Sequence, residues 1–395
     1  MKQIFRFRPS ALALAAAIVL SACGGGGGDH ESSGPSQPSA ALESAPVGGV
    51  LTSVLCNYIA AEELIYVGGV RPRLGEPDQR TVTGEQCLEA QGGGYAAIVD
   101  LVLFDKDGAP IDFTPDETSF TEQRHTEEVE PFLTFVGHTK VTTPGKAGAY
   151  SAFLAFDQSG SISSSDPSNQ RIAAGTLFLQ KNAAPDEVAL GYFPGSGGAL
   201  NYVAPTQQDV FSSDTSQHIK YLQSLEGKQG GGTPLYNALV ASIDLTVKHA
   251  SRPNKAVVAF SDGKDTESSW SLDGVVASAK NAGIPLYMFA LAGADQDFVA
   301  MQQLATGTGG AMLYASSARQ LMAAYGSLGN LLRGNVPVYR LVIKSRGVVQ
   351  TSEICKDAAD GPVRTCNQLF DIMAHTPAGD IPVTVNFSVA VRTEP

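Results

Sequence analysis

Between residues 148 and 333, short apolar runs alternate with longer segments of helical periodicity, an order that only a few folds accommodate. We expect strands at 150–156, 187–192, 255–261, 285–291 and 311–314, and helices at 169–182, 214–225, 234–249, 272–282, 296–304 and 317–333. Strands that alternate with helices form a parallel sheet with helices on both faces. The sequence therefore predicts an α/β domain at 148–333 with a doubly wound, mostly parallel sheet. Its binding site is expected at the carboxyl ends of the central strands.

The segments on either side of this domain, 49–147 and 334–395, are instead rich in β-type runs. Apolar runs stand at 96–104, 132–136, 139–142, 336–344, 348–351, 368–373 and 383–391. In the last of them apolar and polar residues alternate, which is typical of a strand with one buried face. We predict β-sandwich-like segments that either pack together as one sandwich or form two separate β domains.

Residues 1–22 have the composition of a secretion signal, with basic residues followed by an apolar run at 11–20. This run is too short to span a bilayer as a helix. The stretch Leu20-Ser21-Ala22-Cys23 resembles the lipobox of bacterial lipoproteins, which implies cleavage before Cys23 and acylation of that residue. Several acyl chains on one residue give stable membrane attachment. The alternative is an ordinary secretion signal that is cut nearby.

A flexible tether is predicted at 23–48, because residues 24–28 are all glycine and the rest lack apolar periodicity. A flexible chain of about 25 residues has a root-mean-square reach of roughly 25–30 Å. By resemblance to Gram-negative lipoproteins, Gly24 rather than Asp after the cysteine favours the outer membrane. We therefore expect a lipid-anchored protein of the cell envelope, at the periplasmic face of the outer membrane or at the cell surface.

The chain has five cysteines, an odd number for an exported protein. If Cys23 carries lipid, the other four form two disulfides in an oxidising compartment, Cys56 with Cys87 and Cys355 with Cys366. The first pair would close a loop of about 30 residues, worth roughly 3–4 kcal/mol in the chain-entropy model. A metal site at Cys56 and Cys87 is the alternative, but neither has a second cysteine or a histidine nearby.

The balance of charge excludes one class of partner. The formal net charge is −12, with 27 Lys and Arg against 39 Asp and Glu. No basic run is present that could neutralise the phosphates of a nucleic acid. We therefore expect no nucleic-acid partner, and attachment to the membrane only through the lipid.

Five oxygen-bearing residues stand where the predicted α/β domain should build its site. Asp157, Ser159 and Ser161 follow the apolar run 152–156, Thr233 follows three glycines, and Asp262 follows the apolar run 256–260. Singly, each has an ordinary explanation as a turn residue or helix cap. Together they place oxygen donors at the carboxyl ends of two strands and at the start of one helix.

This Asp-x-Ser-x-Ser, Thr and Asp set resembles the metal-ion-dependent adhesion site of von Willebrand factor A domains, over roughly residues 148–333. The resemblance implies that Ser159 and Ser161 bind the metal directly, that Thr233 binds directly or through water, and that Asp157 and Asp262 act mostly through water. A site made only of oxygen suits Mg²⁺ best, with Mn²⁺ or Ca²⁺ as alternatives, and disfavours Zn²⁺.

The resemblance also implies a function in binding rather than catalysis. The metal would accept an Asp or Glu carboxylate from a partner protein, in adhesion or in envelope assembly. The chain has no His-Glu-x-x-His motif, Gly-x-Ser-x-Gly motif or phosphate-binding loop, so we expect no enzyme activity. The alternative is an envelope hydrolase, or its accessory subunit, in which the domain recruits substrate.

The loop after Asp262 carries two more carboxylates and the only tryptophan of the chain. We expect Asp265 and Glu267 to form a solvated acidic rim beside the site. Trp270 is either an ordinary packing residue or an anchor for a partner.

Overall fold

The computed structural model describes residues 45–56, 96–123, 133–142, 148–194, 200–204, 209–262, 264–291, 297–315, 317–345 and 363–392. The predicted secretion signal, lipidated Cys23, Cys87 and Cys355 lie outside these ranges. Cys56 and Cys366 fall in strands whose backbone alone is described at those positions, so the two disulfides stay predictions. Within the described ranges, no helix combines the length and apolar character that crossing a membrane requires.

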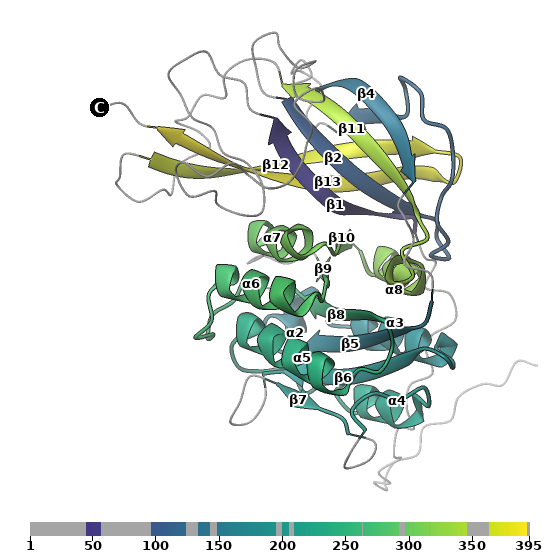
Figure 1. The fold of residues 1–395 in the computed structure, drawn as a ribbon, viewed down its shortest axis with the longest axis vertical. Coiled ribbons are helices and arrows are strands. Elements are labelled where there is room, and N and C mark those ends of the chain that lie inside the picture. The colour runs from purple at the N-terminus through teal and green to yellow at the C-terminus, as the bar shows by residue number, and fades with distance from the viewer. Residues whose placement is uncertain are drawn as a thin grey trace, which may run out of the picture. The chain divides into compact units, whose positions relative to one another are not determined.

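The α/β region is the lower part of Figure 1. Its strands are β5 (Tyr150–Asp157), β6 (Glu187–Phe193), β7 (Asn201–Tyr202), β8 (Asn254–Ser261), β9 (Leu286–Leu291) and β10 (Met312–Ala315). They lie in the order β10-β9-β8-β5-β6-β7, and all neighbours are parallel except the edge strand β7. The predicted doubly wound, mostly parallel sheet is therefore confirmed.

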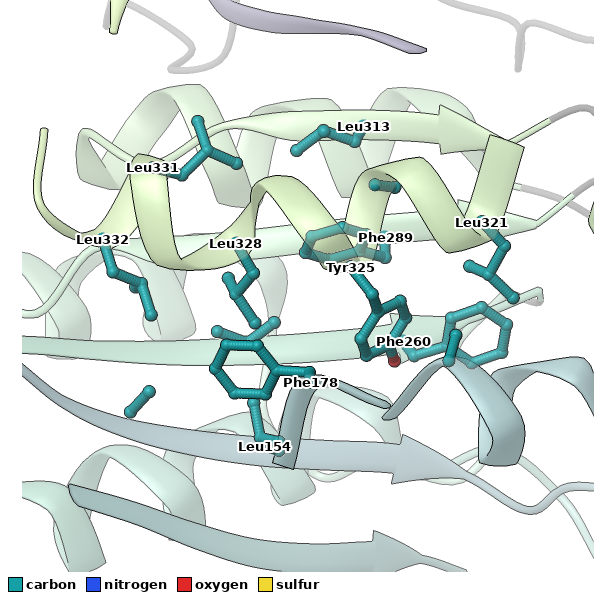
Figure 2. Packing of buried hydrophobic residues seen from close by; sticks show 14 of the residues in the cluster. Leu154, Phe178, Phe260, Phe289, Leu313, Leu321, Tyr325, Leu328, Leu331 and Leu332 are labelled. Carbon is teal, nitrogen blue, oxygen red and sulfur yellow. The ribbon is translucent and has the colours of Figure 1, made fainter. Parts of the chain in front are cut away.

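Helices cover both faces of this sheet. They are α2 (Ile162–Ser165), α3 (Gln170–Lys181), α4 (Ser216–Gln223), α5 (Leu235–His249), α6 (Leu272–Ala282), α7 (Phe298–Thr308) and α8 (Ala318–Leu332). Apolar residues of α3, α4 and α8 pack in one core, and those of α5, α6 and α7 in another. Figure 2 shows the first core, where Tyr325 of α8 lies against Phe289 with ring centroids 5.1 Å apart. Burial on both faces explains why these strands are apolar throughout.

The flanking segments extend the same sheet. The strand β1 (Val47–Cys56) pairs antiparallel with β10, and β2 (Ala96–Phe104), β11 (Pro337–Ser345) and β4 (Leu133–Thr142) follow outward. Because β11 lies between β2 and β4, strands from before and after the α/β region share one sheet of ten strands. A tether ending at residue 48 is therefore too long by two residues, since β1 begins at Val47.

A second sheet packs on this extension. It contains β3 (Phe120–Glu122), β12 (Val363–Thr376) and β13 (Gly379–Arg392), in the order β13-β12-β3. The apolar core between the two sheets includes Leu101, Tyr339, Leu341, Ile372 and Val383. At Gly48 of β1, a side chain would collide with Val383 of β13. Glycine at position 48 therefore allows the two sheets to approach closely at β1.

Candidate metal centre

The site lies where the strand order of the parallel sheet reverses. From β5 the chain passes to β6 on one side and later returns to β8 on the other, so β5 and β8 are neighbours. Asp157 is the last residue of β5, and Asp262 directly follows β8. Both therefore lie at the carboxyl ends of adjacent parallel strands, which we call the carboxyl edge of the sheet.

The carboxylate of Asp157 is fully buried and held by two hydrogen bonds. Its Oδ1 accepts a bond from the backbone N–H of Ser159 at 2.8 Å, and its Oδ2 accepts one from the hydroxyl of Ser261 at 2.5 Å. Burial raises the pKa of Asp157 to about 6, although the bonds from Ser159 and Ser261 lower it, and the charge of Asp262 raises it further. A buried anion without a cation is costly, and a bound cation would favour its charged form.

The other predicted oxygens continue from this carboxylate as a connected cluster. The hydroxyls of Ser159 and Ser161 lie 3.1 Å apart, and Ser161 donates a hydrogen bond to Oδ1 of Asp262 at 2.9 Å. The hydroxyl of Ser165 donates to the second oxygen of Asp262. Two residues absent from the predicted set, Ser165 and Ser261, thus orient the two carboxylates. In the sequence, Ser165 could have been found from the run of serines after Ser161, and Ser261 from its position directly before Asp262.

Thr233 lies in a loop that is hydrogen-bonded to both other loops of the site. Gly231 accepts a backbone bond from Gly160 at 3.0 Å, and Gly230 donates one to Gln158 at 2.8 Å. The backbone of Thr233 in turn bonds to Thr266, through its N–H and its carbonyl, each at 2.9 Å. Thr233 is buried, and Gly231 has a φ of +80° that favours glycine. The structure therefore places Thr233 between the loops that carry Ser159 and Asp262.

Asp265 does not form the solvated rim that the sequence suggested. Its Oδ1 accepts a bond from the backbone N–H of Tyr236 at 3.0 Å and one from the hydroxyl of Ser268 at 2.6 Å. Helix α5 has no cap from its own N-cap residue, Pro234, so the Asp265 carboxylate satisfies a free N–H of its first turn. Glu267 is exposed, and its side chain lies where a Cβ on Gly232 would stand.

Trp270 is exposed but fixed in place. Its side chain is 45% exposed, while its backbone N–H donates to Oδ1 of Asn237 at 3.2 Å. The indole ring lies against Gly274, where an added Cβ would be 3.0 Å from the ring. Asn237 belongs to the first turns of α5, which begins just after Thr233, so the tryptophan loop is attached to the Thr233 side of the site.

The donor set of this edge fits a hard divalent cation. It offers two carboxylates and three hydroxyls and no nitrogen or sulfur, the donor type preferred by Mg²⁺, Mn²⁺ and Ca²⁺. Among the residues that the structure describes, no group of three or more His, Cys, Asp or Glu side chains forms a metal-binding cluster. Hydroxyl oxygens are therefore what distinguish this arrangement from an ordinary acidic cluster.

Comparison with known families identifies the domain. Residues 153–325 match the model of the von Willebrand factor type A domain. The chain therefore contains a domain of this family, and the α/β fold described above is the fold of that domain. No curated protein matches the sequence.

Several solved structures are similar at low identity. An aerotolerance-related membrane protein from Bacteroides fragilis is 19% identical, with 47% of this chain and 98% of that chain covered and a TM-score of 0.35. A von Willebrand factor type A protein from Catenulispora acidiphila is 12% identical, covering 74% and 68%, with a TM-score of 0.39. The pilus adhesin SpaC from Lactobacillus rhamnosus GG is 11% identical, covering 77% and 46%, with a TM-score of 0.39.

Proposed function

Because residues 153–325 form a von Willebrand factor type A domain, we propose that the chain binds a protein partner through a divalent cation at the carboxyl edge. One observation carries the proposal. The oxygens of Ser159, Ser161 and Asp262 form a continuous hydrogen-bonded cluster next to the buried Asp157, although they come from two loops, one after β5 and one after β8.

In this proposal the hydroxyls of Ser159 and Ser161 hold the cation directly, with Thr233 bound directly or through water. By resemblance to the adhesion site of the family, Asp157 and Asp262 act mostly through water, and both also accept hydrogen bonds from serine side chains. Few charged ligands touch the cation, so it supplies an electrophilic position for an Asp or Glu carboxylate of the partner. Mg²⁺ is the proposed ion, and Mn²⁺ or Ca²⁺ has the same ligand preference.

The proposed location of the chain is the outer membrane. The lipobox at Cys23 would attach the chain to the outer membrane, and the residues up to 46 would hold the folded region away from the headgroups. In this arrangement the cation site faces a partner in the envelope or at the cell surface, in adhesion or in envelope assembly.

A hydrolase remains the alternative, and one group of residues bears on it. Thr121 and Nε2 of His375 are 2.9 Å apart, and Nδ1 of His375 is 2.8 Å from Asp380, the order of a nucleophile, a base and an acid. However, the side chains of His375 and Asp380 are 40% and 64% exposed, so water screens their interaction. The buried cluster at the carboxyl edge is the better supported site.

Calorimetric titration of Mg²⁺ into metal-free protein tests the proposal. We expect the wild type to bind Mg²⁺ and Asp157→Asn to lose that binding, while the control Asp244→Asn, an exposed carboxylate on α5, keeps it. A pull-down from envelope extract with Mg²⁺ or with EDTA then tests the partner. Equal heats for wild type and Asp157→Asn would sink the metal site, and retention of partners independent of Mg²⁺ would sink the binding mechanism.

A further inference from the structure

A fully buried arginine lies behind the proposed cation site. Arg171 belongs to the first turn of α3, and its side chain has no exposed surface. Its guanidinium donates four hydrogen bonds, to the carbonyl of Asp157 and to the side chains of Gln158, Asp166 and Asn169. A buried guanidinium is tolerated only when its charge is paired and its N–H groups are bonded.

The positive charge of Arg171 is balanced by the carboxylate of Asp166. Nη1 lies 2.8 Å from Oδ2 of Asp166, which is also almost completely buried. The same carboxylate accepts bonds from the backbone N–H groups of Gln170 and Arg171 at 2.7 and 3.0 Å, and so caps α3. This ion pair needs only Asp166, so it does not explain the bonds that Arg171 makes to the metal loop.

Those other bonds reach the backbone that carries the cation ligands. Nε donates to the carbonyl of Asp157 at 3.2 Å, and Nη2 donates to Oε1 of Gln158 at 2.6 Å. The loop that presents Ser159 is therefore held from behind by two arms of one rigid planar group.

The same network continues to the glycine-rich loop before Thr233. Asn169 accepts from Nη1 of Arg171 at 3.4 Å and from Nε2 of Gln229 at 2.6 Å with the same oxygen. The carbonyl of Gln158 accepts from Gly230 at 2.8 Å. Arg171 thus connects, through Asn169 and Gln158, the two loops whose hydroxyls must surround one ion.

We infer that Arg171 is a positioning residue that makes the site select Mg²⁺ over Ca²⁺, by fixing the separation of the Ser159 loop and the Thr233 loop. The inference rests on the proposed function. Mg²⁺ requires near-octahedral oxygens at about 2.0–2.1 Å, whereas Ca²⁺ accepts irregular geometry at about 2.3–2.6 Å. Loops released from Arg171 would therefore lose Mg²⁺ affinity more than Ca²⁺ affinity.

Arg171→Lys tests this directly, because lysine keeps the positive charge for Asp166 but cannot make the forked bonds to Asp157 and Gln158. Titration of Mg²⁺ and of Ca²⁺ by calorimetry should show Mg²⁺ affinity reduced about 10–100-fold, the usual effect of removing a residue that orients metal ligands. Ca²⁺ affinity should fall less, so the ratio of the two affinities decreases. The matched control is Arg252→Lys, which pairs with Glu187 at the opposite end of the strands and should leave the ratio unchanged.

The outcomes separate this inference from the proposal it rests on. A wild type that binds neither cation overturns the proposed function and the inference with it. A wild type that binds both, with an Arg171→Lys variant that loses thermal stability while its two affinities stay equal to the wild type or fall together, overturns the inference alone. If Arg171→Lys does not fold, Gln229→Ala removes the partly exposed end of the network. It should lower the affinity ratio in the same direction, and an unchanged ratio overturns the inference.

Discussion

Carboxylates at the two ends of the parallel strands have different partners. At the amino end, Asp186 pairs with Arg333, and Glu187 lies near Arg252 and accepts bonds from Ser151 and Ser251. At the carboxyl edge, Asp157 and Asp262 accept bonds only from hydroxyls and a backbone N–H, and within the described residues neither forms an ion pair.

The pKa values follow this difference. Burial alone would raise the pKa of Glu187, but the bonds from Ser151 and Ser251 and the charge of Arg252 together lower it. At Asp157 burial prevails, and the pKa rises to about 6. Asp157 has hydroxyls and a backbone N–H as partners but no basic side chain among the described residues, which is consistent with the cation site proposed above.

The largest expected effect is that removing a buried carboxylate changes the free energy of unfolding in opposite directions at the two ends of the parallel strands. In EDTA at pH 7, Asp157→Asn should raise the free energy of unfolding by on the order of 1–3 kcal/mol, because the variant removes a buried, unpaired charge. Glu187→Gln should lower it by about 1–2 kcal/mol, because the variant weakens bonds to a charged group. Urea unfolding of both variants measures this, and loss of stability in both would remove the distinction between the ends.

The sequence predicted those residues of the site whose position depends on where a strand ends. Asp157 and Asp262 each follow an apolar run, and the doubly wound order alone brings such positions to one edge. The bond between Ser261 and Asp157 joins residues 104 positions apart, and that between Asp265 and Tyr236 joins residues 29 apart. Nothing local in the sequence marks such pairs, so a side chain that completes a helix cap in another loop looked like a solvated charge.

Dependence on residues distant in the sequence also explains why the α/β region was predicted better than the antiparallel strands that extend its sheet. Apart from the short helix α2, which was not predicted, the helices and parallel strands were predicted within a few residues, because burial on both faces gives continuous apolar runs. The strand β1 was not predicted, since Gly48 and Gly49 weaken the β pattern. Their roles depend on Val383 in the other sheet and on Leu313 in the neighbouring strand β10. Pairing of β11 with β2 and β4 depends on strands more than a hundred residues apart, which neither run reveals.

A smaller difference in stability is expected between substitutions of two carboxylates in the loop after Asp262. Asp265→Ala should lower the free energy of unfolding by about 1 kcal/mol, since it leaves the N–H of Tyr236 at the start of α5 without its acceptor. Glu267→Ala, which removes an exposed carboxylate from the same loop, is the control and should change stability by less than about 0.5 kcal/mol. Equal losses measured by thermal unfolding would show that Asp265 does not cap the helix.

The smallest expected effect is a pH dependence of the amino end. Because the pKa of Glu187 is lowered from 4.5 in the folded chain, its contribution to stability is fully present above that value and is lost as the pH falls below it. Glu187→Gln has no such group, so the difference in unfolding free energy between wild type and this variant should shrink as the pH is lowered from 6 toward 3. Urea unfolding across this range checks the expectation. A difference that stays constant would mean that the ionised form of Glu187 does not stabilise this end of the sheet.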